Sequence, residues 1–128
     1  MASELRVNTL KDASGNNSVG MTYVAGGSAK VWTHYSATAL VNSLNSSSFT
    51  DNGQGDHTIA FSTSFSNANY SAQFAAKHSN NNALANSLKT LSTGSIVTIN
   101  GGALNNYLYH TNRTDNDDNC LTIHGDLA

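Results

Sequence analysis

The stretch of this chain that most constrains its fold is a polar turn followed by a run of alternating residues. The turn covers residues 51–56 and reads DNGQGD, and these residue types accept positive φ angles or bond to their own backbone. Every second residue after the turn shares one face: His57, Ile59, Phe61, Thr63 and Phe65. Because a period of two is typical of a half-buried strand, the sequence predicts a β-strand over residues 57–65.

A second turn and strand follow directly. The turn contains Asn67 and Asn69, and a strand over 69–77 places four residues on one face: Tyr70, Ala72, Phe74 and Ala76. Similar patterns predict further strands over residues 4–10, 18–24, 30–36, 40–44, 94–100, 104–110 and 120–124. Within these strands we assign Trp32 to the core and expect Cys120 to pack as a small apolar residue.

Residues 79–93 leave two interpretations open. Leu84, Leu88 and Leu91 have the spacing of one helix face, and Asn82 is a candidate N-cap. The alternative is a polar loop that carries part of a strand. Strands at intervals of about ten residues, separated by Gly and Asn turns, indicate an all-β, antiparallel β-sandwich or jelly-roll-like domain.

The glycines at 26 and 27, followed by Ser28, form the most convincing linker in the chain. We therefore expect an N-terminal attachment or stalk segment over 1–27 and a β-sandwich domain over 28–128. The first segment is too short to bury a core alone, so it needs partner chains or a larger particle to be ordered. Only 38% of the residues are hydrophobic, which makes burial between identical chains an attractive supplement.

Charge and composition exclude several classes of function. The net charge is −2 and the six basic residues are scattered, which predicts no nucleic-acid partner. No apolar run approaches the ~20 residues of a membrane span, so no membrane insertion is expected. The N-terminus lacks an apolar secretion segment, and we expect the chain to mature where it is made. A single cysteine rules out an internal disulfide framework.

No local signature of catalysis stands out, and we expect no enzymatic activity. Ser, His and Asp are plentiful, but no G-x-S-x-G elbow or comparable nucleophile motif is present. The five histidines show no H-x-H or H-x-x-x-H spacing, and surface or half-buried strand positions account for them. The alternative is a metal ion on a three-fold axis, with one ligand from each chain.

The acidic loop near the C-terminus offers oxygen ligands. Asp115, Asp117 and Asn119 are candidates for a structural calcium-type ion, whereas no other cofactor is expected. An EF-hand is rejected because Cys120 replaces its central glycine and a strand follows. A solvated loop is the preferred interpretation.

Aromatic side chains beside that loop suggest a binding surface. Aromatic rings cover the faces of sugars, and amide or hydroxyl groups bond to sugar hydroxyls. The candidate receptor-binding residues are Tyr107, Tyr109, His110, Asn112 and Arg113.

The central motif resembles a module that recurs in tail fibres of tailed bacteriophages, especially those of marine phages. The matching residues are SSSFTDNGQGD at 46–56, Phe61, and NANY at 67–70. The module is similar in its upstream Trp, here Trp32, and in its terminal strand with Gly-Asp, here LTIHGD at 121–126. The opening SELRVNTL at 3–10 also looks like the N-terminal strand of such proteins, although His57 stands where an aromatic residue is frequent.

The resemblance implies a homotrimeric, all-β fibre or knob that contacts the host surface and has no catalytic residues. The implied partners are a host cell-surface glycan or protein and other phage tail proteins. The implied location is the phage tail in the virion, after synthesis in the cytoplasm of the host bacterium. Two alternatives remain: a virion scaffold protein without host contact, and a fibre enzyme that degrades glycans.

Overall fold

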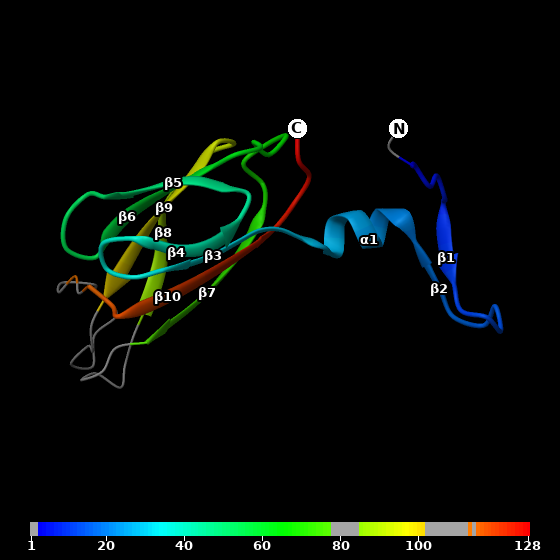
Figure 1. Cartoon of the computed structure of the whole chain (residues 1–128), viewed down its shortest axis with the longest axis horizontal. Coiled ribbons are helices and arrows are strands. Elements are labelled where there is room, and N and C mark those ends of the chain that lie inside the picture. Colours follow the sequence, from blue (N-terminus) through cyan, green and yellow to red (C-terminus); the bar gives the residue numbers. More distant parts are fainter. Residues whose placement is uncertain (1–2, 78–84, 102–112, 114) are drawn as a thin grey trace.

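The computed structural model describes residues 3–77, 85–101, 113 and 115–128. Its elements are β1 (Thr9–Lys11), β2 (Ser18–Gly20), α1 (Met21–Gly27), β3 (Ala29–Tyr35), β4 (Leu40–Leu44), β5 (Ser46–Asp51), β6 (Asp56–Phe61), β7 (Ser71–Lys77), β8 (Ala85–Leu91), β9 (Ser95–Gly101) and β10 (Asp118–His124). The first three elements extend away from the strands that follow (Figure 1).

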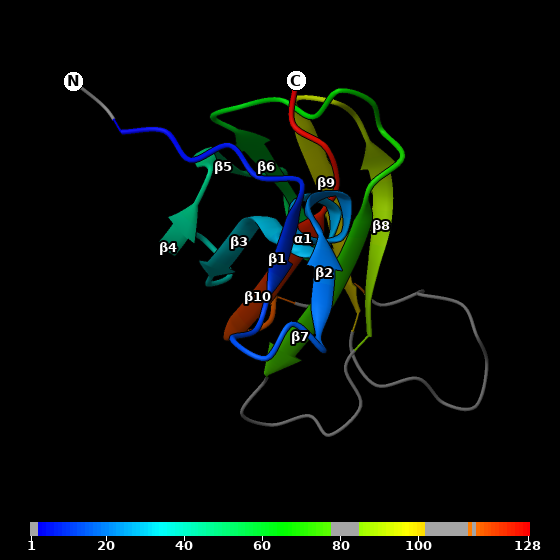
Figure 2. The same cartoon turned by 90° about the vertical axis from the view of Figure 1, so that its right-hand side faces the viewer.

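Strands β3 to β10 form two four-stranded sheets whose neighbours are all antiparallel. One sheet has the order β4-β3-β10-β7 and the other has the order β5-β6-β9-β8. Figure 2 looks toward the sandwich from the side of the N-terminal segment and shows the two sheets side by side, with β4, β3, β10 and β7 in one layer and β5, β6, β9 and β8 in the other. The prediction of an all-β protein with antiparallel sheets is therefore confirmed.

The core lies between the two sheets and draws on both. Its buried apolar residues are Val31, Tyr35, Ile59, Phe61, Phe65, Tyr70, Ile96, Leu121 and Ile123. At one end three rings pack together, with centroids 4.6 Å apart for Phe65 and Tyr70 and 5.2 Å apart for Phe61 and Phe65. Toward the middle, the hydroxyls of Tyr35 and Thr98 lie 3.2 Å apart and join the sheets by a buried hydrogen bond.

The alternation after the central turn has the predicted inner face, but the strand is shorter than predicted. His57, Ile59 and Phe61 are buried, whereas β6 ends at Phe61. The amide of Thr63 donates to Asn45 Oδ1 at 2.6 Å, and Asn45 Nδ2 donates to the Thr63 carbonyl at 3.1 Å. Because the Asn45 side chain forms hydrogen bonds with the backbone N–H and C=O of Thr63, the chain leaves the sheet and reaches Phe65 through a loop.

The strand after the second turn agrees with the prediction, since Ala72, Phe74 and Ala76 lie on its less exposed face. The helix considered within 79–93 is wrong for the described part, which forms strand β8 and pairs with β9. Pairing between strands overrides the helix propensity of this segment, because β9 has a row of backbone N–H and C=O groups that need hydrogen-bond partners.

Both expected strands in the N-terminal segment were predicted too long. The first covers only Thr9–Lys11, and the second ends at Gly20, after which the chain forms helix α1. Strands 40–44, 94–100 and 120–124 match β4, β9 and β10 within two residues, and 104–110 lies outside the described residues.

Two core assignments were wrong. Trp32 is 39% exposed and Cys120 is exposed, because both lie on the outer face of the first sheet. The inner face of β3 is already taken by Val31, Thr33 and Tyr35, which are buried. Since successive side chains alternate between faces, Trp32 has to point outward.

The N-terminal segment lacks a core of its own. Helix α1 has seven residues and none of them is buried, and among the described strands β1 pairs with β2 alone. Leu10 and Val19 are cross-strand partners and are both exposed, as are Leu5 and Tyr23 at 82% and 78%. An isolated hairpin and so short a helix are marginal in water.

The packing at Gly125 gives a testable consequence. A Cβ atom there would lie 2.8 Å from Cβ of Tyr70 and 3.1 Å from Cδ1 of Phe65. We expect Gly125→Ala to lower the free energy of unfolding by about 1–3 kcal/mol, the usual cost of overpacking. Urea unfolding followed by tryptophan fluorescence measures the change.

The matched control for this prediction is Gly26→Ala. A Cβ atom at Gly26 would meet nothing within 4 Å, and the residue lies in α1 outside the sandwich. This control should leave the unfolding of the sandwich unchanged. Equal unfolding midpoints for Gly125→Ala and the wild type would contradict the packing described here.

Candidate functional site

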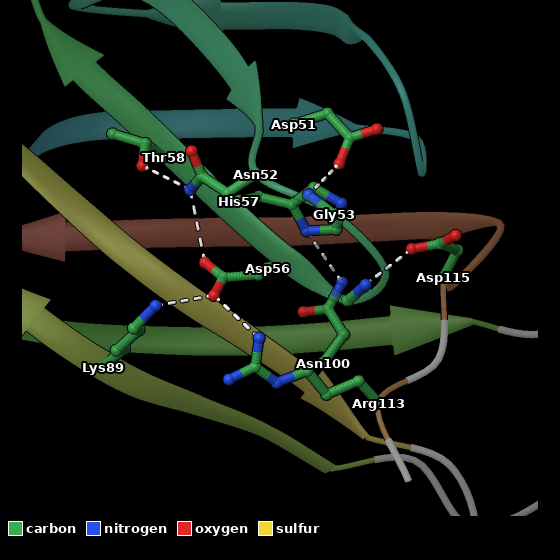
Figure 3. Close-up of polar contacts among 11 residues, drawn as sticks. Asp51, Asn52, Gly53, Asp56, His57, Thr58, Lys89, Asn100, Arg113 and Asp115 are labelled. Atoms are coloured by element: carbon green, nitrogen blue, oxygen red, sulfur yellow. Dashed lines mark hydrogen bonds and ion pairs between the residues drawn. The ribbon is translucent and has the colours of Figure 1, made fainter.

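The turn between β5 and β6 is the centre of the largest group of polar contacts described in the chain (Figure 3). Asp51 Oδ1 accepts a hydrogen bond from the Gly53 amide at 2.9 Å, and the Asp56 amide donates to the Gly53 carbonyl at 2.9 Å. Gly53 and Gly55 have φ angles of 121° and 63°, which favour glycine. The order of residues in DNGQGD therefore sets this turn.

The turn ends in a buried carboxylate. Asp56 has a side chain that is only 4% exposed, and its Oδ2 accepts from Lys89 Nζ at 2.7 Å and from Arg113 Nη1 at 2.9 Å. Its Oδ1 accepts from Asn52 Nδ2 at 3.2 Å, and that amide also donates to Thr58 Oγ1 at 2.8 Å. Figure 3 shows the two cations meeting at the same oxygen of this carboxylate.

The cationic partners hold Asp56 in its ionised form. The hydrogen bond from Lys89 is the main cause that lowers the pKa of the Asp56 carboxyl, and it outweighs burial, which raises that pKa. Asn52 and the charge of Arg113 act in the same direction as Lys89. The result is a charged group that belongs to the folded state, because its partners come from β8 and from residue 113.

The same turn also contacts the segment that leads into β10. The Gly55 amide donates to Asp115 Oδ1 at 2.7 Å, and the Gly55 carbonyl accepts from the Asn100 amide at 2.8 Å. Asp115 and Arg113 thus contact neighbouring residues of one turn. Together these contacts hold the approach to β10 against the second sheet.

His57 fills an aromatic position beside the turn. It is fully buried, and its ring stacks on Phe49 with centroids 5.2 Å apart and meets Tyr35 edge-on at 5.6 Å. Its Nε2 lies 2.9 Å from the Ala37 carbonyl, and its Nδ1 lies 3.3 Å from Asn100 Nδ2. A carbonyl only accepts, so Nε2 carries the proton and Nδ1 accepts from the amide.

Four asparagines continue this polar region between the sheets. Asn116 Nδ2 donates to Asn86 Oδ1 at 3.2 Å and to Asn119 Oδ1 at 3.1 Å. Asn86 is the cross-strand partner of Asn100. We call Asn86, Asn100, Asn116 and Asn119 the amide cluster, and the last three are completely buried.

A second cluster of polar side chains lies on the outer face of the first sheet. His34 Nε2 and Asp118 Oδ1 are 2.9 Å apart, and Lys77 Nζ is 3.7 Å from Asp118 Oδ2. These residues line a shallow hollow of about 310 Å³ together with Ala75, Ala76 and Cys120. Asp118 can orient the His34 imidazole, and Cys120 is the cross-strand neighbour of His34.

The predicted receptor-binding residues fall into two groups. Tyr107, Tyr109, His110 and Asn112 lie outside the described residues. Arg113 is described, and its guanidinium is half-exposed while it pairs with Asp56.

The residues proposed for a metal ion have separate environments. Asp115 Oδ1 accepts the Gly55 amide, Asp117 is exposed, and Asn119 is buried in the amide cluster. Among the described residues, no group of three or more His, Cys, Asp and Glu side chains is placed to hold a metal ion. These residues therefore do not form one site in the described structure.

Comparison of the chain with family models, with curated proteins and with solved structures finds no match in any of the three. In the parts of the chain that the structure describes, no helix has the length and apolar character needed to cross a bilayer. The interpretation of the chain consequently depends on its own residues.

The sequence did not point to the cluster around Asp56. Local pattern indicates only a turn role for Asp56, and its partners Lys89 and Arg113 lie 33 and 57 positions away along the chain. Alternation does not single Asp56 out either, because it precedes the inner residue His57 and falls on the same face as Thr58 and Ala60.

The lowered pKa of Asp56 predicts a dependence of stability on pH. A carboxyl with a lowered pKa in the folded state stabilises the fold above its unfolded pKa of about 3.9, and this contribution is lost as pH falls through the folded value. We expect Asp56→Asn to lower the free energy of unfolding by about 1–3 kcal/mol at pH 7. The difference from the wild type should shrink below about pH 4, as measured by urea unfolding across pH.

Asp126→Asn is the control for that experiment, because the Asp126 side chain is exposed and only its backbone carbonyl accepts hydrogen bonds from Ser66. The control should follow the wild-type curve at neutral pH. A difference between Asp56→Asn and the wild type that stays constant from pH 7 to pH 3 would show that Asp56 is not an ionised anchor.

Proposed function

We propose that this protein is a subunit of a homotrimeric bacteriophage tail fibre, whose β-sandwich, with jelly-roll-like character, contacts the surface of the host bacterium. It acts by adhesion and not by catalysis. Its place is the virion tail, where the segment over 1–27 attaches to other tail proteins or continues a stalk.

The main support for this proposal is that the N-terminal segment exposes apolar residues. Leu10 and Val19 form an exposed apolar pair on a hairpin that no other described strand of the chain joins. The helix that follows buries nothing. Such elements require a neighbour to be stable, and copies of the same chain supply one in a symmetric assembly.

The resemblance of the central motif to tail-fibre modules supports the same function. Its residues have structural roles: Asp51, Asn52 and Gly53 make the turn, while Phe61 and Tyr70 pack in the core. A motif of turn and core residues suits a protein whose task is to hold a shape. Three copies of a weak binding site then gain avidity on a repetitive surface.

A virion scaffold without host contact is the second candidate. The observation that favours it is the internal use of Arg113 and Asp115, which bind Asp56 and Gly55 of the same chain. Residues occupied in this way have fewer polar groups left for a receptor. Cell binding separates the two candidates.

Trimerisation is the first measurement. We expect sedimentation equilibrium to give three times the 13.5 kDa mass of the chain at micromolar concentration. Leu10→Asp combined with Val19→Asp should dissociate the trimer, since each buried Leu or Val contributes about 1.5–3 kcal/mol and charges cannot replace it. The near-ultraviolet circular dichroism of the sandwich should remain.

The matched control places aspartates on the opposite face of the hairpin, at Thr9 and Ser18, which should leave the trimer intact. A wild-type chain that sediments as a monomer at micromolar concentration would overturn the proposal. So would a trimer that the Leu10 and Val19 substitutions leave unchanged.

Host contact is the second measurement. Fluorescently labelled wild-type protein should bind intact cells within a panel of marine bacteria, and the Leu10→Asp/Val19→Asp variant should bind at least about tenfold more weakly through lost avidity. A trimer that binds no cell of the panel favours the scaffold. Release of reducing sugar from bacterial polysaccharide would instead favour a glycan-degrading fibre.

A further inference from the structure

Within the described residues, three completely buried polar atoms of the amide cluster have no hydrogen-bond partner: Asn100 Oδ1, Asn116 Oδ1 and Asn119 Nδ2. An unpaired polar group in a protein interior costs about 1–3 kcal/mol. Three such groups in one contiguous cluster therefore require an explanation.

The free atom of Asn100 follows from its neighbours. The Ala37 carbonyl requires a proton on His57 Nε2, so His57 Nδ1 is an acceptor and takes a proton from Asn100 Nδ2. Exchanging the oxygen and nitrogen of Asn100 would place its oxygen against that acceptor. Asn100 Oδ1 is thus an acceptor that needs a donor.

The other two free atoms are one donor and one acceptor in either orientation of the network. Asn116 Nδ2 gives its protons to Asn86 and Asn119, and Asn86 Nδ2 donates to Asn119 Oδ1 at 3.5 Å. Reversing a single one of these amides sets donor against donor or acceptor against acceptor. Reversing all three restores the network and again leaves one donor and one acceptor free.

The free atoms therefore consist of two acceptors and one donor. A water molecule donates two hydrogen bonds and accepts at least one, and buried waters make about three bonds to groups of this kind. A cation does not fit, because the free amide donor would point its protons at the positive charge. No apolar group fits either, since it would satisfy none of the three atoms.

We propose that the amide cluster binds one internal water molecule, which bridges Asn100 on β9 to Asn116 and Asn119 at the start of β10. The cross-strand pairing of Asn86 with Asn100, and the contacts of Asn86 with Asn116 and Asn119, bring these amides together. The water links the second sheet to β10, an inner strand of the first sheet. The water thereby helps to hold Arg113 and Asp115 in place. Its presence does not depend on the proposed function.

A crystal structure of the full chain is the first test. We expect one solvent peak at about 2.7–3.2 Å from Asn100 Oδ1 and from the free atoms of Asn116 and Asn119. An empty cluster with amides that pair among themselves overturns the proposal. A peak with six or more oxygen ligands at about 2.3–2.6 Å is a cation and overturns it as well.

The second test is in solution and uses nuclear Overhauser effects between water and the side-chain amide protons of the cluster. The wild type should show cross peaks with the sign of a long-lived water. Asn119→Leu keeps the side-chain volume but removes both the Nδ2 donor and the Oδ1 acceptor. This variant should lose the cross peaks to water, while its Trp32 fluorescence shows that the chain is folded. If that variant does not fold, Asn100→Leu takes its place. A folded wild type without such cross peaks contradicts the bound water.

Discussion

Burial of the inner faces of the two sheets against each other is the interaction on which the rest of the structure depends. With 38% hydrophobic residues, the chain gathers its large apolar side chains into one core between the sheets, which includes Phe65, Ile59 and Tyr35. The space between the sheets is filled further on by His57, Thr98 and the amide cluster.

This change from apolar to polar interior explains why the turn at residues 51–56 matters. A polar interior is stable only if its groups are paired, and the turn supplies partners for several of them. Asp56 anchors Lys89 and Arg113, while Gly55 bonds to Asn100 and Asp115. This turn is thus the point where β6, β8, β9 and the approach to β10 meet.

The sandwich and the N-terminal segment differ in whether they have a core of their own. The sandwich has a core of its own, and its outer face exposes Trp32 beside Leu44, its cross-strand partner. The N-terminal hairpin and helix have exposed apolar residues and no core. A chain built this way is explained most simply as one subunit of a larger assembly, which is the basis of the proposed fibre.

Local pattern was enough to find most strands, because a period of two is a property of neighbouring residues. The inner positions of β6 and β7 could therefore be named in advance. The helix over Met21–Gly27 was missed, and strand β8 was only one of two interpretations left open, since short apolar segments fit either structure and packing decides between them. Trp32 was misassigned because alternation shows which residues share a face but not which face is inside.

What the sequence determined by itself is the all-β class, the central turn and the alternation of side chains along the main strands, since these follow from side-chain type and spacing. Only the tertiary structure decided which charged and amide groups meet. The pairing of Asp56 with Lys89 and Arg113, and of Asn86 with Asn116 and Asn119, joins residues that are distant along the chain. The physical reason is that such contacts depend on strand order and register, which arise when both sheets bury their faces together.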